Sequence, residues 1–242
     1  MLKRLSILVI VLLATSVQVF GQNDDDDNEN ENDGHLDAHM GLGFPEGEFK
    51  DAVGDRAFFG VGGGIYFPLV RKLTLELGLT YHYYWMERQE EDFQIDDPQF
   101  GEYEVTSVVN SNMMPIHANL RVSPLKNLNN AFYPYIEGIA GFRLFNSRTR
   151  ISVDDYTQNP PPDEIENETK GAWSYGYAGG LSIKLSRVIF IDGRVEKLYG
   201  TESSYIDSES IEYNDNTQEA TYDKVSSNTN LMTYSLGLRF QF

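Results

Sequence analysis

Histidine is the side chain best suited to proton transfer and metal binding near neutral pH, and this chain has four. His35 and His39 are four residues apart, a spacing that places two side chains on one face of a helix. On a strand the same spacing covers about 13 Å, too far for one ion. The chain has no cysteine, which excludes thiolate metal sites, disulfides and cysteine nucleophiles. We therefore predict neither a metal centre nor a cofactor.

The other two histidines, His82 and His117, fall on polar positions of alternating stretches and could lie close together on neighbouring strands. A hydrolase or acyltransferase would need a histidine beside a serine and an acid. His82 with Ser107 or Ser174 is the combination that this sequence offers. It contains no G-x-S-x-G motif to present a serine nucleophile. We therefore expect that the chain is not an enzyme.

Ten charged residues occupy the polar positions of the alternating stretches. Five are acidic and five basic, although the whole chain has a net charge of −18. They are Asp37, Glu76, Arg121, Glu137, Arg143, Lys184, Asp192, Arg194, Glu196 and Arg239. An unpaired charge is costly in a narrow interior, so this balance is typical of ion pairs. We interpret the set as a charge network in the lumen of a barrel; an ion pathway is the alternative.

The excess acid lies elsewhere, in residues 90–102 and 202–224. Long acidic loops could bind divalent cations or a basic partner. They could also serve only solubility and repulsion between neighbouring molecules, and the sequence leaves both interpretations open. The strongly negative chain is not expected to bind nucleic-acid phosphates.

The elements that would position these residues are strands. Apolar and polar residues alternate over 73–85, 173–185 and 232–242, so each stretch has one apolar and one polar face. Eight such segments can be drawn, near 34–45, 57–68, 72–87, 104–123, 132–148, 172–186, 188–200 and 229–242. A tilted strand crosses a bilayer in about 9–11 residues, whereas soluble strands average about 5–6. We predict an all-β fold, an eight-stranded antiparallel up-and-down transmembrane β-barrel.

The connections between these segments also favour a membrane barrel. Those at 68–72, 123–131 and 186–187 are short, and the other four are longer. Short turns at one end and long loops at the other are typical of transmembrane barrels. An even strand number then places both termini at the short-turn, periplasmic end. Aromatic residues near segment ends, such as Trp85 and Trp173, suit the membrane interface.

The N-terminus is typical of an exported protein. Lys3 and Arg4 precede an apolar run over 5–14, and small residues near Gly21 suit cleavage, so we predict a signal peptide over 1–21. Residues 22–34 form an acidic linker that we expect to be disordered and that does not fit the spacing of a calcium-binding EF-hand loop. The barrel would span 35–242 and lie in the outer membrane after cleavage.

Three further motifs carry a resemblance to a known family. They are Met114-Pro115-Ile116-His117-Ala118-Asn119-Leu120-Arg121, Tyr133-Pro134-Tyr135-Ile136-Glu137-Gly138 and Leu236-Gly237-Leu238-Arg239-Phe240-Gln241-Phe242. With the predicted signal peptide, they make the chain similar to the outer-membrane β-barrels common in Bacteroidota, which are related in architecture to the transmembrane domain of OmpA. The resemblance covers nearly all of the mature chain. It implies a fold and a location rather than an activity, and an OmpA-like barrel without the peptidoglycan-binding domain.

These interpretations predict a small outer-membrane barrel with a structural or accessory binding role. Its acidic extracellular loops would face cations or a partner, and its partners would be outer-membrane lipid and another outer-membrane or surface protein. A narrow pore of the porin kind is the alternative, although a water-filled channel needs a wider barrel. A lipid-modifying enzyme at the barrel rim, using His82, is the third hypothesis.

Overall fold

The computed structural model describes residues 34–70, 75–97, 101–124, 131–154, 164–206, 212–214, 219–221 and 224–242. The predicted signal peptide, and the predicted acidic linker as far as residue 33, lie outside the described residues.

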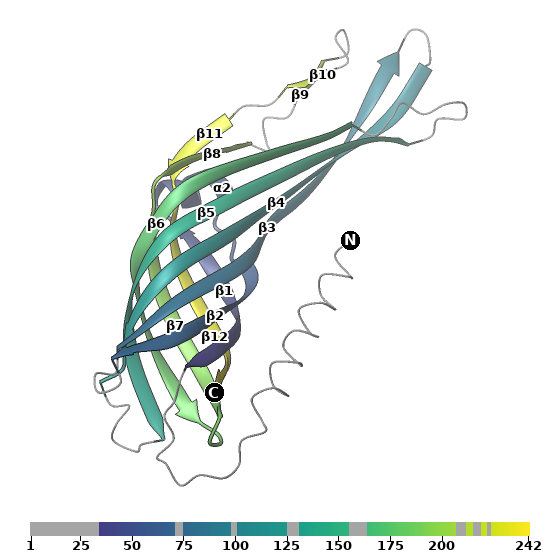
Figure 1. Ribbon diagram of the computed structural model, residues 1–242. Helices are drawn as coiled ribbons and strands as arrows, with labels where there is room; N and C mark the ends of the chain where they lie inside the picture. The colour runs from purple at the N-terminus through teal and green to yellow at the C-terminus, as the bar shows by residue number, and fades with distance from the viewer. Residues whose placement is uncertain are drawn as a thin grey trace.

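Eight long antiparallel strands close into a barrel (Figure 1). They are β1 (His35–Glu46), β2 (Phe58–Val70), β3 (Leu75–Asp97), β4 (Gly101–Val122), β5 (Phe132–Asp154), β6 (Glu164–Lys184), β7 (Ile189–Gly200) and β12 (Asn230–Gln241). Around the barrel the order is β1-β12-β7-β6-β5-β4-β3-β2, so each strand pairs with its neighbours along the chain. This confirms the predicted all-β, eight-stranded, up-and-down antiparallel barrel.

The barrel is closed by a seam between its first and last strands. β1 pairs with β12 along its whole length, from His35↔Gln241 to Glu46↔Asn230. Closure gives every barrel strand two neighbours, so the backbone N–H and C=O groups are paired on both sides. We call the end at His35 and Gln241 the turn end and the opposite end the loop end.

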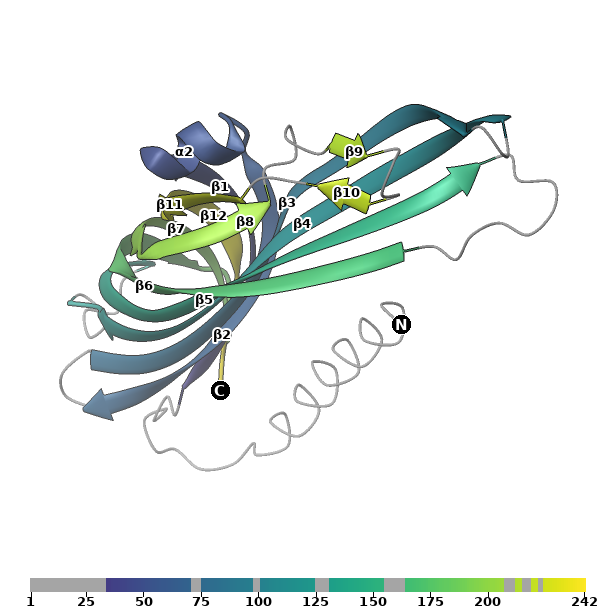
Figure 2. The ribbon, with the colours of Figure 1, turned by 90° about the horizontal axis from the view of Figure 1, so that it is seen from above.

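Four of the strands extend far beyond the others at the loop end. β3, β4, β5 and β6 contain 21 to 23 residues, whereas β1, β2, β7 and β12 contain 12 or 13. The excess forms a four-stranded extension, residues 87–97, 101–111, 147–154 and 164–168, that projects from the barrel (Figures 1 and 2). The sequence placed the ends of these strands at 87, 104, 148 and 172. The boundary at 104 lies within three residues of Gly101, where β4 begins, and the other three are wrong. The ladders continue because each strand still has an antiparallel partner. Apolar and polar residues also alternate there, in short runs such as Asp92-Phe93-Gln94-Ile95-Asp96 that the predicted boundaries left out.

The other two connections at the loop end also contain regular structure. Between β1 and β2 lies the short helix α2 (Glu48–Val53), which the sequence did not predict. Between β7 and β12, β8 (Glu202–Ile206) pairs with β11 (Lys224–Asn228), and β9 (Glu212–Asn214) pairs with β10 (Glu219–Thr221). In the part of the chain that the structure describes, no helix is long and apolar enough to cross a membrane.

The barrel has its polar residues inside and its apolar residues outside. Along β3, Glu76, Thr80 and His82 are buried, whereas the intervening Leu77 and Leu79 are exposed. The same alternation holds on the other barrel strands, and the exposed set includes Met40, Ile136, Trp173, Tyr175 and Leu236. Because successive strand residues point to opposite faces, the period of two predicted from the sequence sets this arrangement.

Candidate functional site in the barrel interior

Nine of the ten charged residues predicted to face the lumen are buried in the barrel. These are Asp37, Glu76, Arg121, Glu137, Arg143, Asp192, Arg194, Glu196 and Arg239. The tenth, Lys184, is exposed at the last position of β6, where the inward face of the strand reaches the rim of the turn end. Burial alone does not say which of them pair, and the structure separates them into groups.

Arg121 on β4 lies at the centre of the largest group and is completely buried. Its Nε donates to Glu137, and its Nη2 lies 3.0 Å from Asp37 Oδ2. Its Nη1 lies 2.8 Å from Nε2 of His35. All three nitrogens of the guanidinium therefore have a partner, as a buried charge requires.

Two tyrosine rings enclose the same guanidinium. The Cζ atom of Arg121 lies 3.8 Å from the ring centroid of Tyr66 and 4.1 Å from that of Tyr135, within the range of cation–π attraction. Both rings lie over glycines. A Cβ at Gly78 would come within 2.3 Å of the Tyr66 ring, and one at Gly180 within 2.2 Å of the Tyr135 ring. These two glycines thus make room for the rings that cover Arg121.

Arg239 and Arg194 extend the group across the lumen. Arg239 bridges Asp37, at 3.2 Å, and Asp192, at 3.0 Å. Nη2 of Arg194 lies 2.7 Å from Glu137 Oε2 and 2.6 Å from Glu196 Oε1. We call Asp37, Arg121, Glu137, Asp192, Arg194, Glu196 and Arg239 the ion-pair network.

Uncharged side chains add hydrogen bonds to the network. The hydroxyl groups of Tyr135 and Ser182 donate to the two oxygens of Asp192, at 2.7 and 2.5 Å. The hydroxyl group of Thr233 donates to Glu196 Oε2 at 2.8 Å. Ser182 and Thr233 lie directly opposite their partners on neighbouring strands, whereas Tyr135 reaches Asp192 from a strand that is not its neighbour. Alternation indicated the inward face but not the register that selects these partners.

A layer of histidines lies next to the network. His39 and His82 meet through their Nε2 atoms, and His117 Nε2 lies 3.1 Å from the hydroxyl oxygen of Ser174. Ser174 therefore pairs with His117. The sequence had suggested a pairing of Ser174 with His82 instead. The side chain of the other candidate, Ser107, lies outside the described residues.

The histidine layer offers little that a substrate or an ion could use. His117 and Ser174 are both buried, so a substrate cannot approach the hydroxyl group in this conformation. Among the residues that the structure describes, no group of three or more histidine, aspartate or glutamate side chains is arranged to hold a metal ion. The contact between His117 and Ser174 therefore fits a hydrogen bond that stabilises the fold.

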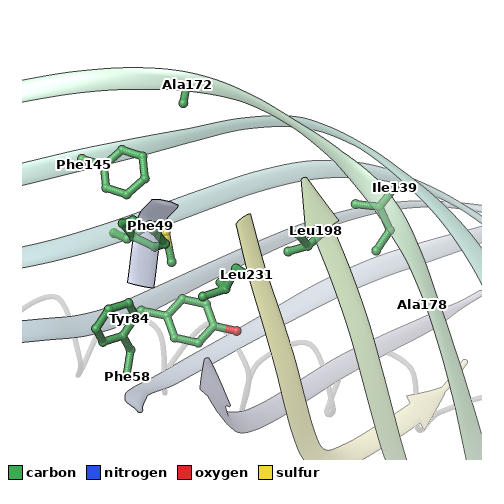
Figure 3. Packing of buried hydrophobic residues seen from close by; sticks show 10 residues of the cluster. Phe49, Phe58, Tyr84, Ile139, Phe145, Ala172, Ala178, Leu198 and Leu231 are labelled. Carbon is green, nitrogen blue, oxygen red and sulfur yellow. The ribbon is translucent and has the colours of Figure 1, made fainter. Parts of the chain in front are cut away.

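The loop end of the lumen is filled by apolar side chains, which we call the plug. They are Phe49, Phe58, Tyr84, Met113, Phe145, Leu198 and Leu231. Phe49 comes from α2, is completely buried, and makes edge-to-face contacts with Phe58 and Phe145, each with ring centroids 6.0 Å apart. Figure 3 shows Phe49 lying between Phe145 and Tyr84. Sequence reasoning did not find the plug, because a single phenylalanine in a six-residue helix has no periodicity.

Arg143 is set apart from the ion-pair network. It is completely buried and lies on β5 two residues from Phe145 of the plug, paired with Pro115 and Ala172 on the neighbouring strands. Its Nη1 donates to the backbone carbonyl of Thr229. Its Nε and Nη2 are buried and have no hydrogen-bond partner among the described residues. Arg143 is thus buried in the lumen as predicted, but its partners across the ladder, Pro115 and Ala172, are apolar and offer it no ion pair.

Known proteins resemble this chain in fold only. The chain matches no family model and no curated protein sequence. Among solved structures, Neisserial surface protein A is 14% identical over 86% of this chain and 97% of its own, with a TM-score of 0.46. The outer-membrane protein OprG of Pseudomonas aeruginosa is 10% identical over 90% and 99%, with a TM-score of 0.44. Ail, the attachment invasion locus protein of Yersinia pestis, is 10% identical over 88% and 100%, with a TM-score of 0.43.

These three structures are of bacterial proteins. They come from Neisseria, Yersinia and Pseudomonas, so the affiliation with Bacteroidota stays a prediction.

Proposed function

We propose that the chain is a small outer-membrane barrel that serves as a closed, non-conducting scaffold and presents its four-stranded extension to a partner outside the cell. The observation that carries this proposal is the filled lumen. The ion-pair network, the histidine layer and the plug follow one another from the turn end to the loop end. Eight strands enclose little more than the volume of their inward side chains, so this filling favours a scaffold over a pore.

The outer surface supports a membrane location. Met40, Leu79, Ile136, Trp173 and Leu236 lie on different strands and are between 56% and 70% exposed. An apolar belt that encircles the molecule is far larger than the few hundred Å² that soluble monomers usually expose. Lipid is the partner that would cover it. The shortest barrel strands have 12 residues, enough for the roughly 9–11 that a tilted strand needs to cross a bilayer.

The extension supports a binding role. β3, with 23 residues, is 11 residues longer than β1, with 12, which corresponds to about 35 Å of strand. After Trp85, β3 pairs with β4 but no longer with β2, which leaves an open sheet edge in the part of the chain that the structure describes. The sequence of this edge, 87–97, contains six acidic residues and one basic residue. A partner with a basic surface would match it in charge.

Planar-bilayer recording tests the closed state. Purified protein is reconstituted beside a detergent blank and a wide porin as a positive control. We expect no steady conductance above the blank. Stable, cation-selective channels would show that the charges line a pore, and the alternative of a narrow transport protein would replace the scaffold.

Removal of the half of the extension that carries its acidic edge tests the binding role of that edge separately. A variant in which residues 87–111 are replaced by a short Asn-Gly turn keeps the barrel portions of β3 and β4. Surface crosslinking on intact cells should yield an adduct with the full chain and none with this variant, at equal amounts in the outer membrane. An adduct that forms equally with both proteins would place the contact elsewhere.

A further inference from the structure

The plug and Arg143 together have the chemistry of a ligand site that is closed by the chain itself. We infer that Phe49 and α2 are a displaceable stopper, and that a monocarboxylate whose apolar part is about the size of one phenyl ring takes the place of Phe49 and pairs with Arg143. This inference does not depend on the proposed role of the extension.

The first step is the unexplained cost of Arg143. A completely buried guanidinium with two unsatisfied nitrogens destabilises a fold, because its lost hydration is not replaced. Arg121, which is equally buried, has a partner at every nitrogen. A methionine at position 143 would fill similar space between Ala172 and Phe145 at no such cost. An unsatisfied buried group of this kind calls for an explanation such as a ligand or a trapped water molecule.

The second step is the geometry of the two unsatisfied nitrogens. In a guanidinium, the N–H bonds of Nε and Nη2 point the same way along one edge and form the fork that a carboxylate accepts in a two-pronged pair. In Arg143 the third nitrogen, Nη1, is the one that is already engaged, with the carbonyl oxygen of Thr229. The edge left over is thus the one that suits a carboxylate.

The third step is the apolar surroundings. Along β5 the next inward residue toward the loop end is Phe145, whose partner on β4 is Met113. Phe49 packs against Phe145 from α2. The volume that Phe49 would vacate is therefore one phenyl ring in size and lined by apolar side chains, and Arg143 lies one inward position further along β5 from Phe145, which contacts Phe49. A small carboxylate with a ring-sized apolar part matches both the space and the charge.

The fourth step is the attachment of the stopper. α2 has six residues, well below the roughly 12–15 at which an isolated helix becomes stable in water. It is flanked by Gly47 and Gly54, which adopt positive φ angles of 58° and 83° and so occupy backbone conformations that other residues resist. Phe49, Ala52 and Val53 pack against the apolar cluster, and Glu48 accepts hydrogen bonds from the backbone and side chain of Asn228, at 3.1 and 2.9 Å on the exposed surface. Because the helix is short and lies between two glycines, we infer that it can move away from the barrel as a unit.

The position of the site also limits what it can do. It is reached from the loop end, and the ion-pair network lies below it toward the turn end. A bound acid would therefore stay at the loop end of the lumen and keep α2 displaced from the barrel. This is the behaviour of a receptor and not of a channel.

The test uses 4-fluorophenylacetate as the probe and fluorine NMR titration of the full barrel in detergent micelles. The Phe49→Ala variant should bind the probe at least 10-fold more tightly than the wild type, because the competing side chain has been removed. The double variant Phe49→Ala/Arg143→Met should lose this binding. The matched control is Phe49→Ala/Arg148→Met, because Arg148 is an exposed arginine on the same strand and its loss should change nothing.

A second comparison needs no change at Arg143. The neutral amide, 4-fluorophenylacetamide, should bind Phe49→Ala at least 10-fold more weakly than the acid. Partition of either probe into micelles is measured with the double variant and subtracted. Equal affinity for acid and amide, or no saturable binding to Phe49→Ala, would overturn the inference and leave Arg143 with a trapped water molecule.

Discussion

Arg121→Leu and Arg143→Met remove the same kind of group from the same lumen, yet we expect opposite effects on stability. Arg121→Leu withdraws one cation from a layer that contains five acids and three arginines: Asp37, Glu76, Glu137, Asp192, Glu196, Arg121, Arg194 and Arg239. Two arginines would then face five acids. Breaking a buried pair in this way costs about 3–5 kcal/mol.

The lower end of that range applies to Arg121, because its two acidic partners retain other cations. Glu137 keeps Arg194 at 2.7 Å, and Asp37 keeps Arg239 at 3.2 Å. We therefore expect a loss of about 3 kcal/mol in the free energy of unfolding for Arg121→Leu. Arg143→Met forfeits one hydrogen bond but removes two unsatisfied buried donors, each of which costs about 1–3 kcal/mol. The variant should unfold at the same denaturant concentration as the wild type or a higher one.

Denaturant unfolding in lipid vesicles measures both values. The chain has two tryptophans, Trp85 and Trp173, and both lie exposed on the outer face, where their fluorescence reports on contact with lipid. Arg148→Met is the control for loss of an exposed arginine. If Arg143→Met were as destabilising as Arg121→Leu, then Arg143 would have a strong partner, and the division of the lumen into network and plug would be wrong.

Three further predictions concern the rings in the lumen, the membrane and the orientation. Gly78→Ala and Gly180→Ala should each lower the free energy of unfolding by about 1–3 kcal/mol, because the new methyl group displaces a tyrosine ring from Arg121. Gly138→Ala is the control in the same unfolding assay and should have little effect, because a Cβ at Gly138 meets no atom within 4 Å. The purified protein in detergent should give a β-type circular dichroism spectrum and migrate differently on gels before and after boiling, and its recovery in the soluble periplasmic fraction would contradict the membrane location. Protease added to intact cells should cut within 90–102 or 203–226 and spare 123–131, whereas cleavage confined to 123–131 would reverse the orientation.

The period of two in the sequence was enough to predict the barrel and its inverted faces. Leu77 and Leu79 alternate with Glu76 and Thr80, and a strand can separate these two sets only by turning one inward and one outward. The chemistry of a narrow interior then indicated that inward charges would pair. Partner choice, however, depends on strand register across the whole barrel, which no local pattern encodes.

The features that sequence reasoning missed have either a short pattern or none. Beyond Trp85 the strands run on as a four-stranded sheet, in which the alternation recurs only in short runs such as 92–96. Phe49 acquires its role from its position above the lumen and not from its neighbours in the sequence. Arg143 looked like any other inward arginine, and only the apolar residues on adjacent strands set it apart.

The seam between β1 and β12 has a consequence for how the molecule forms. His35 and Gln241 are paired although 205 residues lie between them, and Asp37 forms its ion pair with Arg239 across the same boundary. Hairpins between consecutive strands close short loops and can form early, whereas contacts so distant in sequence carry the largest loop-closure entropy and form slowly. Until the last strand docks, Asp37 lacks one of its cations and β1 has an open edge. We therefore expect the barrel to close in a single cooperative step, when β12 pairs with β1.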